Sequence, residues 1–252
     1  MTTAERRKEL YELIKENKEL DVNFIRDHFK VSAVTVRNDL IHLERNSLVT
    51  RQFGKVVLKQ SNINDRFENN STKNLYEKEK IGRYASKLIS RDESILIYAG
   101  TTTLQLAHFI PDNVNICAVI NSIYIANELK DHTNVKTVFI GGNLNSETGS
   151  TYGIEAISQL KKYNIDKLFL SVSGIDTKNG ITSDQPFETD INLAMIQRAE
   201  KVIVLADHTK IGASHFTTIG CLPKVSMIIT DNKADAGEIE KFRAMGIEVV
   251  TV

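Results

Sequence analysis

Five apolar runs between residues 94 and 206 are each followed by small, hydroxyl-bearing or amide residues that are suited to binding an anion. The five segments are Ala99-Gly100-Thr101-Thr102-Thr103, Asn121-Ser122, Gly141-Gly142-Asn143, Ser173-Gly174-Ile175-Asp176 and Asp207-His208-Thr209-Lys210. Glycine and hydroxyl residues at the start of a helix expose backbone N–H groups to an anion, and Lys210 adds a full positive charge. Together the segments predict a pocket for a small phosphorylated, hydroxyl-rich ligand.

Each segment by itself also has a purely structural interpretation, because glycine after a strand is ordinary turn chemistry and threonine is an ordinary helix cap. The sequence has neither the G-x-G-x-x-G pattern of dinucleotide sites nor a Walker A pattern. No two of its histidines have H-x-x-x-H spacing, which argues against a zinc site. We therefore expect no cofactor and no metal ion.

The segment that must position these residues alternates short apolar runs with helical patterns. The runs are SILIY (94–98), VNICAVI (114–120), VKTVFI (135–140), KLFLSV (167–172), KVIVLA (201–206), VSMIIT (225–230) and IEVVTV (247–252). Continuous Val, Ile and Leu runs separated by helices are typical of buried parallel strands with crossover helices. Residues 75–252 are therefore predicted to form one doubly wound, mostly parallel α/β domain. Ligands of such domains bind beyond the carboxyl ends of the strands.

The first part of the chain carries a local excess of positive charge. The whole sequence has 32 Lys+Arg and 32 Asp+Glu, whereas residues 1–59 have 12 and 9, a balance of +3. Between Lys30 and Lys59 there are six basic and two acidic residues, a balance of +4. A basic segment on a neutral chain favours binding to a polyanion.

Apolar residues recur at helical spacing in three segments of this basic part. A first helix is predicted over residues 3–17, Asp21 can cap a second helix, and Ser32 can cap a third that runs to about Arg45. The inward-facing residues are Leu10, Leu13 and Ile14, then Val22, Ile25 and Phe29, then Val36, Leu40 and Leu43. Four side chains of the third helix lie off its apolar stripe and face outward, namely Thr35, Arg37, Asn38 and His42.

The residues after the third helix, LVTRQFGKVVL, form two β-type runs around Phe53-Gly54-Lys55 and predict a hairpin that carries Arg51 and Lys55. Three helices followed by a basic hairpin are the layout of a winged helix-turn-helix domain. The third helix of such a domain fits the major groove of double-stranded DNA, and the hairpin can lie along phosphates. A three-helix bundle with a charged surface is the alternative that the pattern alone leaves open.

A segment rich in Asn and Ser, KQSNINDRFENNSTKN (59–74), separates the two parts and lacks apolar periodicity. It is interpreted as a hydrated connector. The predicted organisation is thus a DNA-binding domain at 1–58, a linker at 59–74, and a ligand-binding and oligomerisation domain at 75–252.

The composition is that of an ordinary globular protein, with 41% hydrophobic and 25% charged residues. No apolar run approaches the roughly 18–20 residues of a membrane-spanning helix. The amino terminus, MTTAERRKELYEL, is too charged for an export signal. Cys117 and Cys221 lack ligand spacing and are expected to be buried free thiols in a reducing compartment. These features predict a cytoplasmic protein without a membrane partner.

The stretch VSAVTVRNDLIHLERNSLVTR closely resembles the recognition region of the DeoR-type (DeoR/GlpR family) bacterial transcriptional regulators, with its V-S-x-x-T-[IV]-R-x-D-L core. The resemblance implies that four residues face DNA, namely Ser32, Thr35, Arg37 and Asn38. Phosphates repel a carboxylate, so Asp39 is expected to form an internal ion pair instead. Two departures bear on the preferred DNA sequence. The family usually has a second basic residue at Asn38, and His-Gly-Gly at Phe53-Gly54-Lys55.

The α/β part contains GTTT, LQLAHFI, INSIYIANEL, GGN, SVSGID and VLADHTKIG in the order found in the effector domain of the same regulators. That domain is similar to ribose-5-phosphate isomerases, and the resemblance implies a sugar-phosphate effector. It assigns the phosphate to Gly100, Thr101, Thr102 and Thr103, with Asn121, Ser122 and Lys210 nearby, and the sugar hydroxyls to Asp176, Glu188 and Asp207. Tyr98 replaces an acidic residue of the family and Asn192 a lysine, so the identity of the sugar stays open.

An aldose–ketose isomerase needs a general base and a cation. The isomerases that the domain resembles carry a carboxylate followed by Lys where this chain has Asn192-Leu193. An amide cannot abstract the proton, so we expect no enzymatic activity. Two alternatives remain: a sugar-phosphate enzyme whose small head mediates assembly, and a DNA-binding protein whose α/β domain only oligomerises.

The sequence thus predicts a DNA-binding transcriptional regulator, a repressor of a carbohydrate-utilisation operon, whose affinity for its operator changes when a phosphorylated sugar binds. We expect a homo-oligomer, either a dimer or a tetramer, because one recognition helix reads only a few base pairs.

Overall fold

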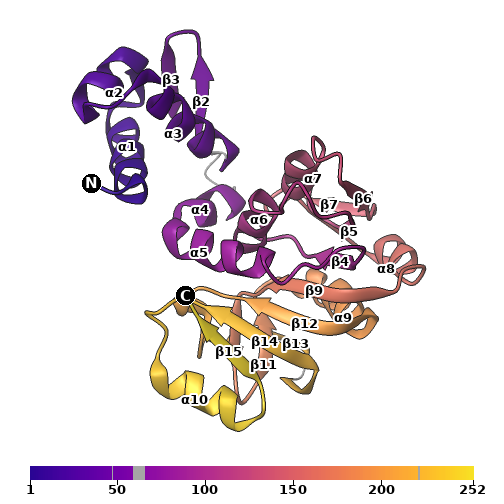
Figure 1. Ribbon diagram of the computed structural model, residues 1–252. Coiled ribbons are helices and arrows are strands. Elements are labelled where there is room, and N and C mark those ends of the chain that lie inside the picture. The colour runs from indigo at the N-terminus through magenta and orange to yellow at the C-terminus, as the bar shows by residue number, and fades with distance from the viewer. Residues whose placement is uncertain (47, 59–65, 221) are drawn as a thin grey trace. The chain divides into compact units, whose positions relative to one another are not determined.

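The computed structural model of the protein describes residues 1–46, 48–58, 66–220 and 222–252. The chain divides into two compact units, Met1–Lys73 and Asn74–Val252 (Figure 1). Each unit has its own sheet and its own set of buried apolar side chains. We refer to them as unit 1 and unit 2.

Unit 1 contains the three predicted helices, which are α1 (Thr3–Asn17), α2 (Val22–Phe29) and α3 (Ala33–Arg45). The two predicted caps are confirmed, because the Asp21 carboxylate accepts the first N–H groups of α2 and the Ser32 hydroxyl accepts the N–H of Thr35. The buried residues include Leu10, Ile14, Ile25, Val36, Leu40 and Leu43. The prediction of inward-facing side chains was wrong in part, since three of them are only half-buried at the edges of their stripes, namely Leu13, Val22 and Phe29.

A small antiparallel sheet completes unit 1. The predicted hairpin is confirmed as β2 (Val49–Gln52) and β3 (Lys55–Leu58), with Gln52 paired to Lys55 across the turn. A third strand, β1 (Glu19–Asp21), pairs with β3 and places it in the middle of the sheet. The sequence analysis missed β1 because three residues are too few to show an alternating pattern.

A buried ion pair joins α3 to α1. The carboxylate of Asp39, whose side chain is 3% exposed, lies 2.6 Å from Nε of Arg6 and 2.9 Å from Nε of Arg7. The predicted internal ion pair of Asp39 is therefore confirmed. Two guanidinium groups share one carboxylate, so the cluster keeps one net positive charge.

The predicted connector is wrong over its second half, because Arg66–Thr72 forms helix α4. Phe67 in this helix is buried, which gives the segment an apolar contact that its polar composition conceals. The first half, residues 59–65, lies outside the described residues.

Unit 2 is built on seven parallel strands that coincide with the seven apolar runs of the sequence. They are β4 (Ser94–Ile97), β5 (Ile116–Ile120), β6 (Val135–Phe139), β9 (Ile165–Ser171), β12 (Ala199–Leu205), β14 (Val225–Thr230) and β15 (Glu248–Thr251). Their order in the sheet is β15-β14-β12-β9-β4-β5-β6, and every neighbouring pair is parallel. The predicted doubly wound fold is confirmed. The direction of winding reverses between β4 and β9, which makes this pair of strands the switch point.

Six α-helices accompany this sheet in the described part of unit 2, and Figure 1 shows them around it. They are α5 (Leu75–Ser86), α6 (Thr101–His108), α7 (Ile123–Leu129), α8 (Ile154–Leu160), α9 (Thr189–Arg198) and α10 (Ala236–Ala244). Three short 3-10 helices are η1 (Pro186–Glu188), η2 (His208–Lys210) and η3 (Leu222–Lys224). Helices α5 and α6 approach closely at Gly82, where a Cβ atom would lie 2.5 Å from the carbonyl carbon of Gln105.

Two small antiparallel sheets of unit 2 were not predicted. One is the hairpin β7 (Asn143–Asn145) and β8 (Ser150–Tyr152). The other has the order β10-β11-β13, with β10 (Gly174–Asp176), β11 (Gly180–Ser183) and β13 (Thr217–Gly220). These strands have three or four residues and a polar or glycine-rich composition, and such a local pattern is typical of turns.

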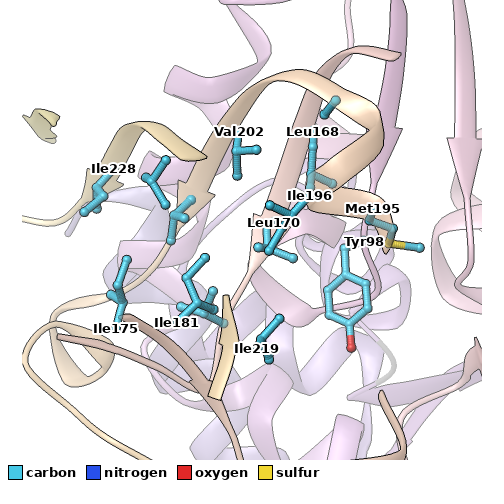
Figure 2. Close-up of a cluster of buried hydrophobic side chains, with 14 of the residues drawn as sticks. Tyr98, Leu168, Leu170, Ile175, Ile181, Met195, Ile196, Val202, Ile219 and Ile228 are labelled. Atoms are coloured by element: carbon cyan, nitrogen blue, oxygen red, sulfur yellow. The ribbon is translucent and has the colours of Figure 1, made fainter. Parts of the chain in front are cut away.

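The second antiparallel sheet and α9 share an apolar core with the parallel sheet. Figure 2 shows Leu168, Leu170, Val202 and Ile228 of the parallel strands beside Met195 and Ile196 of α9, and beside Ile175, Ile181 and Ile219 of the small sheet. All of these side chains are buried. The core therefore holds the segments after β9 and β12 against the carboxyl half of the parallel sheet.

None of the helices that the structure describes has both the length and the apolar character needed to span a membrane. Cys117 is a free thiol and is half-buried, so the expectation that it is buried was wrong. Cys221 lies outside the described residues.

We predict that Asp39→Ala destabilises unit 1 by about 2–3 kcal/mol, because two partly buried guanidinium groups lose their counter-ion. Hydrogen–deuterium exchange of the α1 and α3 amides in the full chain measures this local stability. Asp27→Asn is the matched control, since Asp27 pairs only with its exposed neighbour Arg26 in the described structure. Unchanged exchange in Asp39→Ala would show that the ion pair contributes nothing.

Candidate functional site

The outer surface of α3 is open to a partner. Arg37 and Asn38 are exposed, and Thr35 and His42 are half-buried. Within the described part of the chain, the guanidinium of Arg37 has no ion-pair partner. The hydroxyl of Ser32 is 2.8 Å from that of Thr35 and caps the helix, so Ser32 contributes to the shape of the helix start. Arg37 is therefore, among the described residues, a cation on this surface that is free to bind a partner.

The two predicted cations of the hairpin are exposed but already paired. Nε of Arg51 lies 2.6 Å from Glu44 of α3, and Nζ of Lys55 lies 2.8 Å from Glu19 of β1. The hydrogen bond from Lys55 to Glu19 raises the pKa of this lysine. Exposed pairs of this kind contribute little to stability because water and salt screen them, so a phosphate can replace either carboxylate.

The second candidate site lies where β4 ends and α6 begins. Gly100 is the N-cap of α6, and no side chain caps the first N–H groups of this helix. A Cβ atom at Gly100 would lie 2.4 Å from Cβ of Ser171, the last residue of β9. Glycine thus lets the start of α6 lie against the end of β9, at the switch point. Uncapped N–H groups at a helix start are donors for an anion.

The three threonines after Gly100 differ in what their hydroxyl groups do. The hydroxyl of Thr103 is buried and donates to the carbonyl of Tyr98 at 2.6 Å, so it holds the loop in place. Thr102 is buried and Thr101 is half-buried. Thr101 is therefore the residue of this group whose hydroxyl is best placed for a ligand.

The residues after β5 are used by the protein itself. The side-chain amide of Asn121 accepts the N–H of Ala99 at 2.9 Å and donates to the carbonyl of Thr151 at 3.0 Å. The hydroxyl of Ser122 caps α7. Both side chains are completely buried. They join the ends of β4 and β5 to the β7–β8 hairpin, which is a structural role.

The glycines after β6 lie at a distance from the switch point. The N–H of Gly141 donates to the side chain of Gln159, and a Cβ atom at Gly142 would lie 2.5 Å from the carbonyl oxygen of Tyr152. Strands β6 and β12 are separated by β5, β4 and β9, which amounts to roughly 19 Å at the usual strand spacing. A small ligand that reaches Lys210 after β12 therefore cannot also reach Gly141.

Glu188 is the centre of a buried polar cluster at the same edge. Its carboxylate accepts hydrogen bonds from the hydroxyl groups of Tyr98 at 2.7 Å, Ser150 at 2.6 Å and Thr148 at 3.1 Å. The side-chain amide of Asn192 donates to the Tyr98 hydroxyl at 3.2 Å. Its buried carbonyl oxygen has no hydrogen-bond partner among the described residues. Hydrogen bonds thus connect Glu188 to Tyr98, and Tyr98 to Asn192.

Sequence reasoning missed Ser150 and Thr148, because their hairpin carried no recognisable pattern. It noted Tyr98 and Asn192 only as departures from a family pattern, since their hydrogen bond joins residues 94 positions apart.

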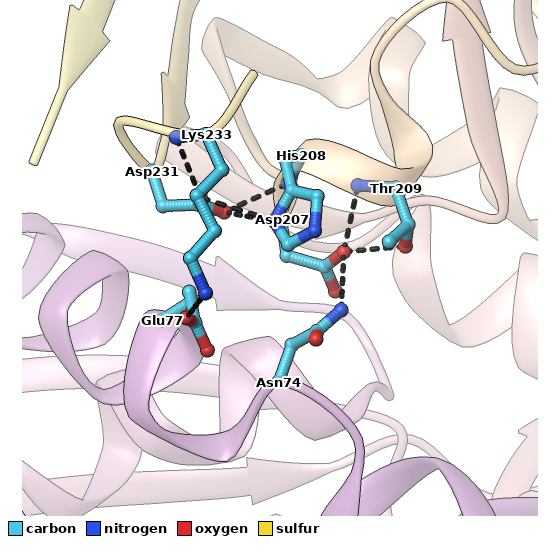
Figure 3. Close-up of polar contacts among 7 residues, drawn as sticks. All are labelled: Asn74, Glu77, Asp207, His208, Thr209, Asp231 and Lys233. Carbon is cyan, nitrogen blue, oxygen red and sulfur yellow. Dashed lines mark hydrogen bonds and ion pairs between the residues drawn. The ribbon is translucent and has the colours of Figure 1, made fainter.

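The loop after β12 is held by a second polar cluster, shown in Figure 3. The buried Asp207 carboxylate accepts from the N–H of Thr209 at 3.0 Å and from the amide of Asn74 at 3.2 Å. His208 Nδ1 lies 3.0 Å from Asp231, which follows β14. Lys233 forms an ion pair with Glu77 of α5. The cluster connects α5 to the ends of β12 and β14.

Asp207 and Asp176 bind backbone groups of their own loops. Asp207 caps η2, and Asp176 accepts the N–H groups of Lys178 and Asn179 at 2.7 Å each in the β10–β11 turn. Burial opposes ionisation of Asp176, but these donors outweigh it and hold the pKa of its carboxyl below the usual value. Lys210 ends η2, is half-buried, and has no ion-pair partner among the described residues.

The predicted ligand residues therefore fall into two groups. Among the described residues, the groups with free binding capacity are the start of α6 at Gly100 and Thr101, the ammonium of Lys210, and the side-chain carbonyl oxygen of Asn192 beside Glu188. The side chains of Thr103, Asn121, Ser122, Asp176 and Asp207 bind other parts of the protein. Among the described residues, no three His, Cys, Asp or Glu side chains form a metal-binding group.

Comparison with known proteins agrees with the division of the chain into unit 1 and unit 2. Residues 6–62 match the DeoR-like helix-turn-helix domain, and residues 73–232 match the DeoR C terminal sensor domain. The HTH-type transcriptional repressor GlcR of Bacillus subtilis is 30% identical over 252 residues, covering 99% of this chain and 96% of the relative. The glycerol-3-phosphate regulon repressor of Escherichia coli is 27% identical and covers 92% of both chains.

Solved structures are more distant. Ribose 5-phosphate isomerase A from Methanocaldococcus jannaschii is 15% identical, with a TM-score of 0.39 over 53% of this chain and 52% of that one. A protein described as a probable sor operon regulator from Shigella flexneri is 9% identical, with a TM-score of 0.43 over 64% of this chain and 86% of that one. These similarities are too low to support a functional argument.

The relatives of similar length are named as regulators and repressors, which confirms the expectation that the chain is not an enzyme. Both the DNA-binding unit and the sensor unit match the same family in the same order. The chain belongs to the DeoR family of DNA-binding transcriptional regulators.

Proposed function

We propose that this regulator is a cytoplasmic repressor of a carbohydrate-utilisation operon, and that a phosphorylated sugar bound at the carboxyl edge of the parallel sheet changes its affinity for DNA. The observation that carries the proposal is that two groups suited to an anion follow strands at the same edge of the sheet: the uncapped helix start at Gly100 after β4, and the ammonium of Lys210 after β12, which has no ion-pair partner among the described residues. The repressor names of the glycerol-3-phosphate and GlcR relatives support the carbohydrate context.

The phosphate end of the ligand is assigned to the switch point. Strands β4 and β12 are separated only by β9, so their carboxyl ends lie roughly 10 Å apart at the usual strand spacing. We assign the N–H groups at the start of α6 and the ammonium of Lys210 to the same anion. A charged donor and backbone donors together select a dianionic group over a neutral one.

The hydroxyl end of the ligand is assigned to the Glu188 cluster. Tyr98 is two residues before Gly100 in the chain and donates to Glu188, so the two ends of the proposed site share one loop. The carbonyl oxygen of Asn192 lacks a donor among the described residues and is buried. A buried acceptor without a donor is costly, and a sugar hydroxyl supplies the missing hydrogen bond.

Helix α5 is suited to carry a signal from this site. It begins directly after Asn74, which is the first residue of unit 2. Asn74 binds Asp207, the cap of the helix that carries Lys210, and Gly82 of α5 packs on the backbone of α6. A ligand that draws Lys210 toward α6 therefore pulls on both contacts of α5. The ligand must prefer one position of α5 over the other, since otherwise it shifts no equilibrium.

We expect the regulator to act as a dimer or a tetramer. One α3 helix reads only a few base pairs, so two copies on repeated half-sites are needed for selective binding.

Arg37→Ala tests the role of α3. If Arg37 reads a base, specific binding weakens by about 1–3 kcal/mol. If it contacts only phosphate, binding to all duplexes weakens alike and the salt slope falls by about one unit. Gel-shift titrations at two salt concentrations, on a duplex that the protein selects from a random pool, separate these results. Arg91→Ala, an exposed arginine in unit 2, is the control, and identical curves for Arg37→Ala and wild type would exclude α3 as the recognition helix.

Lys210→Ala tests the phosphate assignment. We expect it to weaken binding of the sugar phosphate roughly tenfold to a hundredfold, because a charge-assisted contact contributes about 1.5–3 kcal/mol, while DNA binding without ligand stays unchanged. Thermal shifts with a panel of sugar monophosphates measure the loss. Lys224→Ala is the matched control, because this exposed lysine precedes β14 at the opposite edge of the sheet. Full stabilisation of the Lys210 variant would refute the assignment, and no stabilisation of wild type would favour a purely oligomeric role.

Asn74→Gly tests the coupling. Asn74 has φ +51°, a conformation that glycine adopts without strain, so the change removes the bond to Asp207 and leaves the backbone intact. We expect the ligand to bind as tightly as before and to change DNA affinity less, with a loss of about 1 kcal/mol of coupling. Thermal shifts report the first quantity and gel shifts with and without ligand report the second. Asn127→Gly on α7 is the control, and full coupling in Asn74→Gly would exclude this route.

A further inference from the structure

Phe53, at the tip of the β2–β3 hairpin, has no apolar neighbour to cover it. Its exposed fraction of 106% is the largest among the large apolar side chains that the structure describes. The next residue, Gly54, has φ +75° and open space on the side where a Cβ atom would stand. An aromatic ring in this position gains nothing from packing in the free protein.

The backbone beneath this ring is firmly held. The N–H of Val22, at the start of α2, donates to the carbonyl of Gly54 at 3.0 Å. Strand β3 is paired on both sides, with β1 and with β2, and Lys55 pairs with Asp21 and with Gln52 in register. The tip is therefore a fixed platform, and little conformational freedom is lost when a partner covers the ring.

The same hairpin is fixed to the recognition helix. Glu44 of α3 accepts hydrogen bonds from both the backbone N–H and the guanidinium of Arg51 on β2. Arg51 and Lys55 place one cation two residues before Phe53 and another two residues after it. When α3 lies in a major groove, an adjacent hairpin crosses the phosphates and meets the neighbouring minor groove, because the two grooves alternate along the duplex.

We propose that Phe53 inserts its ring into the minor groove of the operator beside the bases that α3 faces, and separates one base step as an apolar wedge. Apolar side chains that enter the minor groove unstack base steps in this way, and the bent duplex then covers more protein surface. Arg51 and Lys55 neutralise the phosphates on either side of the wedge. Pyrimidine–purine steps unstack most easily, so the wedge adds a preference for such a step at a position that no polar side chain reads.

The physical signature of a wedge differs from that of a cation. Burial of an aromatic ring releases no counter-ions, so its loss weakens binding without changing the salt dependence, whereas loss of a phosphate contact lowers the salt slope by about 0.9. The ring is fully exposed in the free protein, so its removal leaves no cavity and is not expected to affect folding.

The experiment compares Phe53→Ala, Phe53→Leu and Lys55→Ala in the full-length protein with the wild type. The probe is the duplex that the wild type selects from a random pool. It carries 2-aminopurine at the base step beside the bases that α3 faces, where the ring is proposed to insert. Phe24→Ala is the matched control, since Phe24 is a partly exposed aromatic residue of α2 in the same unit that stacks on His28. We expect Phe53→Ala to weaken binding by about tenfold or more, the range for loss of one base–aromatic contact, with an unchanged salt slope. Phe53→Leu should retain most of the affinity and Lys55→Ala should lower the slope.

The fluorescence of 2-aminopurine should rise when the wild type binds and should stay low with Phe53→Ala, because an unstacked base is no longer quenched by its neighbours. Wild-type affinity in Phe53→Ala, a salt slope that falls with the affinity, or an unresponsive probe would each overturn the proposal. A change of oligomeric state in Phe53→Ala, measured by sedimentation, would also overturn it, because the ring would then face a second copy of the chain rather than DNA.

Discussion

The parallel register of seven strands is the constraint on which unit 2 depends. All seven carboxyl ends lie at one edge of the sheet, and the reversal of strand order separates the helices that follow β4 and β9 at that edge. The absence of a side chain at Gly100 lets α6 begin against Ser171 at the end of β9. A methyl group there would force the two strand ends apart. The position of the uncapped N–H groups of α6 therefore follows from this close packing together with the hydrogen bonds that Thr103 and Asn121 make to the same loop.

Most polar side chains at this edge hold the edge together. Asn121, Thr103 and Asp207 are buried; Asn121 binds a backbone group of the neighbouring loop, and Thr103 and Asp207 bind backbone groups of their own loops. These hydrogen bonds also preorganise the site, because loops fixed in this way keep the few free groups in place before a ligand binds. Lys210 and the carbonyl oxygen of Asn192 are free in the described structure, and they are the groups through which the proposed ligand gains affinity.

In unit 1, too, some charged side chains bind other parts of the protein and others stay available to a partner. Asp39 lies two residues after Arg37 on α3, yet its carboxylate turns inward to Arg6 and Arg7. The outer surface of the helix thus keeps the positive charge of Arg37 without an opposing carboxylate nearby on the same turn. The pairs of Arg51 with Glu44 and of Lys55 with Glu19 are exposed, so they orient the cations and yield readily to phosphates.

The sequence by itself determined the seven parallel strands, the three helices of unit 1 with their caps, the hairpin, and the inward position of Asp39. The strands, helices and hairpin follow from local periodicity and from capping chemistry, which act over a few residues, whereas the inward position of Asp39 was inferred from the repulsion that DNA phosphates would exert on a carboxylate. The sequence missed β1, α4 and the two small antiparallel sheets of unit 2. Their residues are too few or too polar to show a period, and long-range pairing or burial stabilises them.

Only the tertiary structure decided which of the predicted ligand residues are available. Tyr98 meets Asn192, and Asn74 meets Asp207, across 94 and 133 positions of the chain. Gly141 has the same local pattern as Gly100, but it stands two strands farther along the sheet. Residue types and spacing do not predict which of these residues meet. Hydrogen bonding and strand order bring together residues that no local pattern relates.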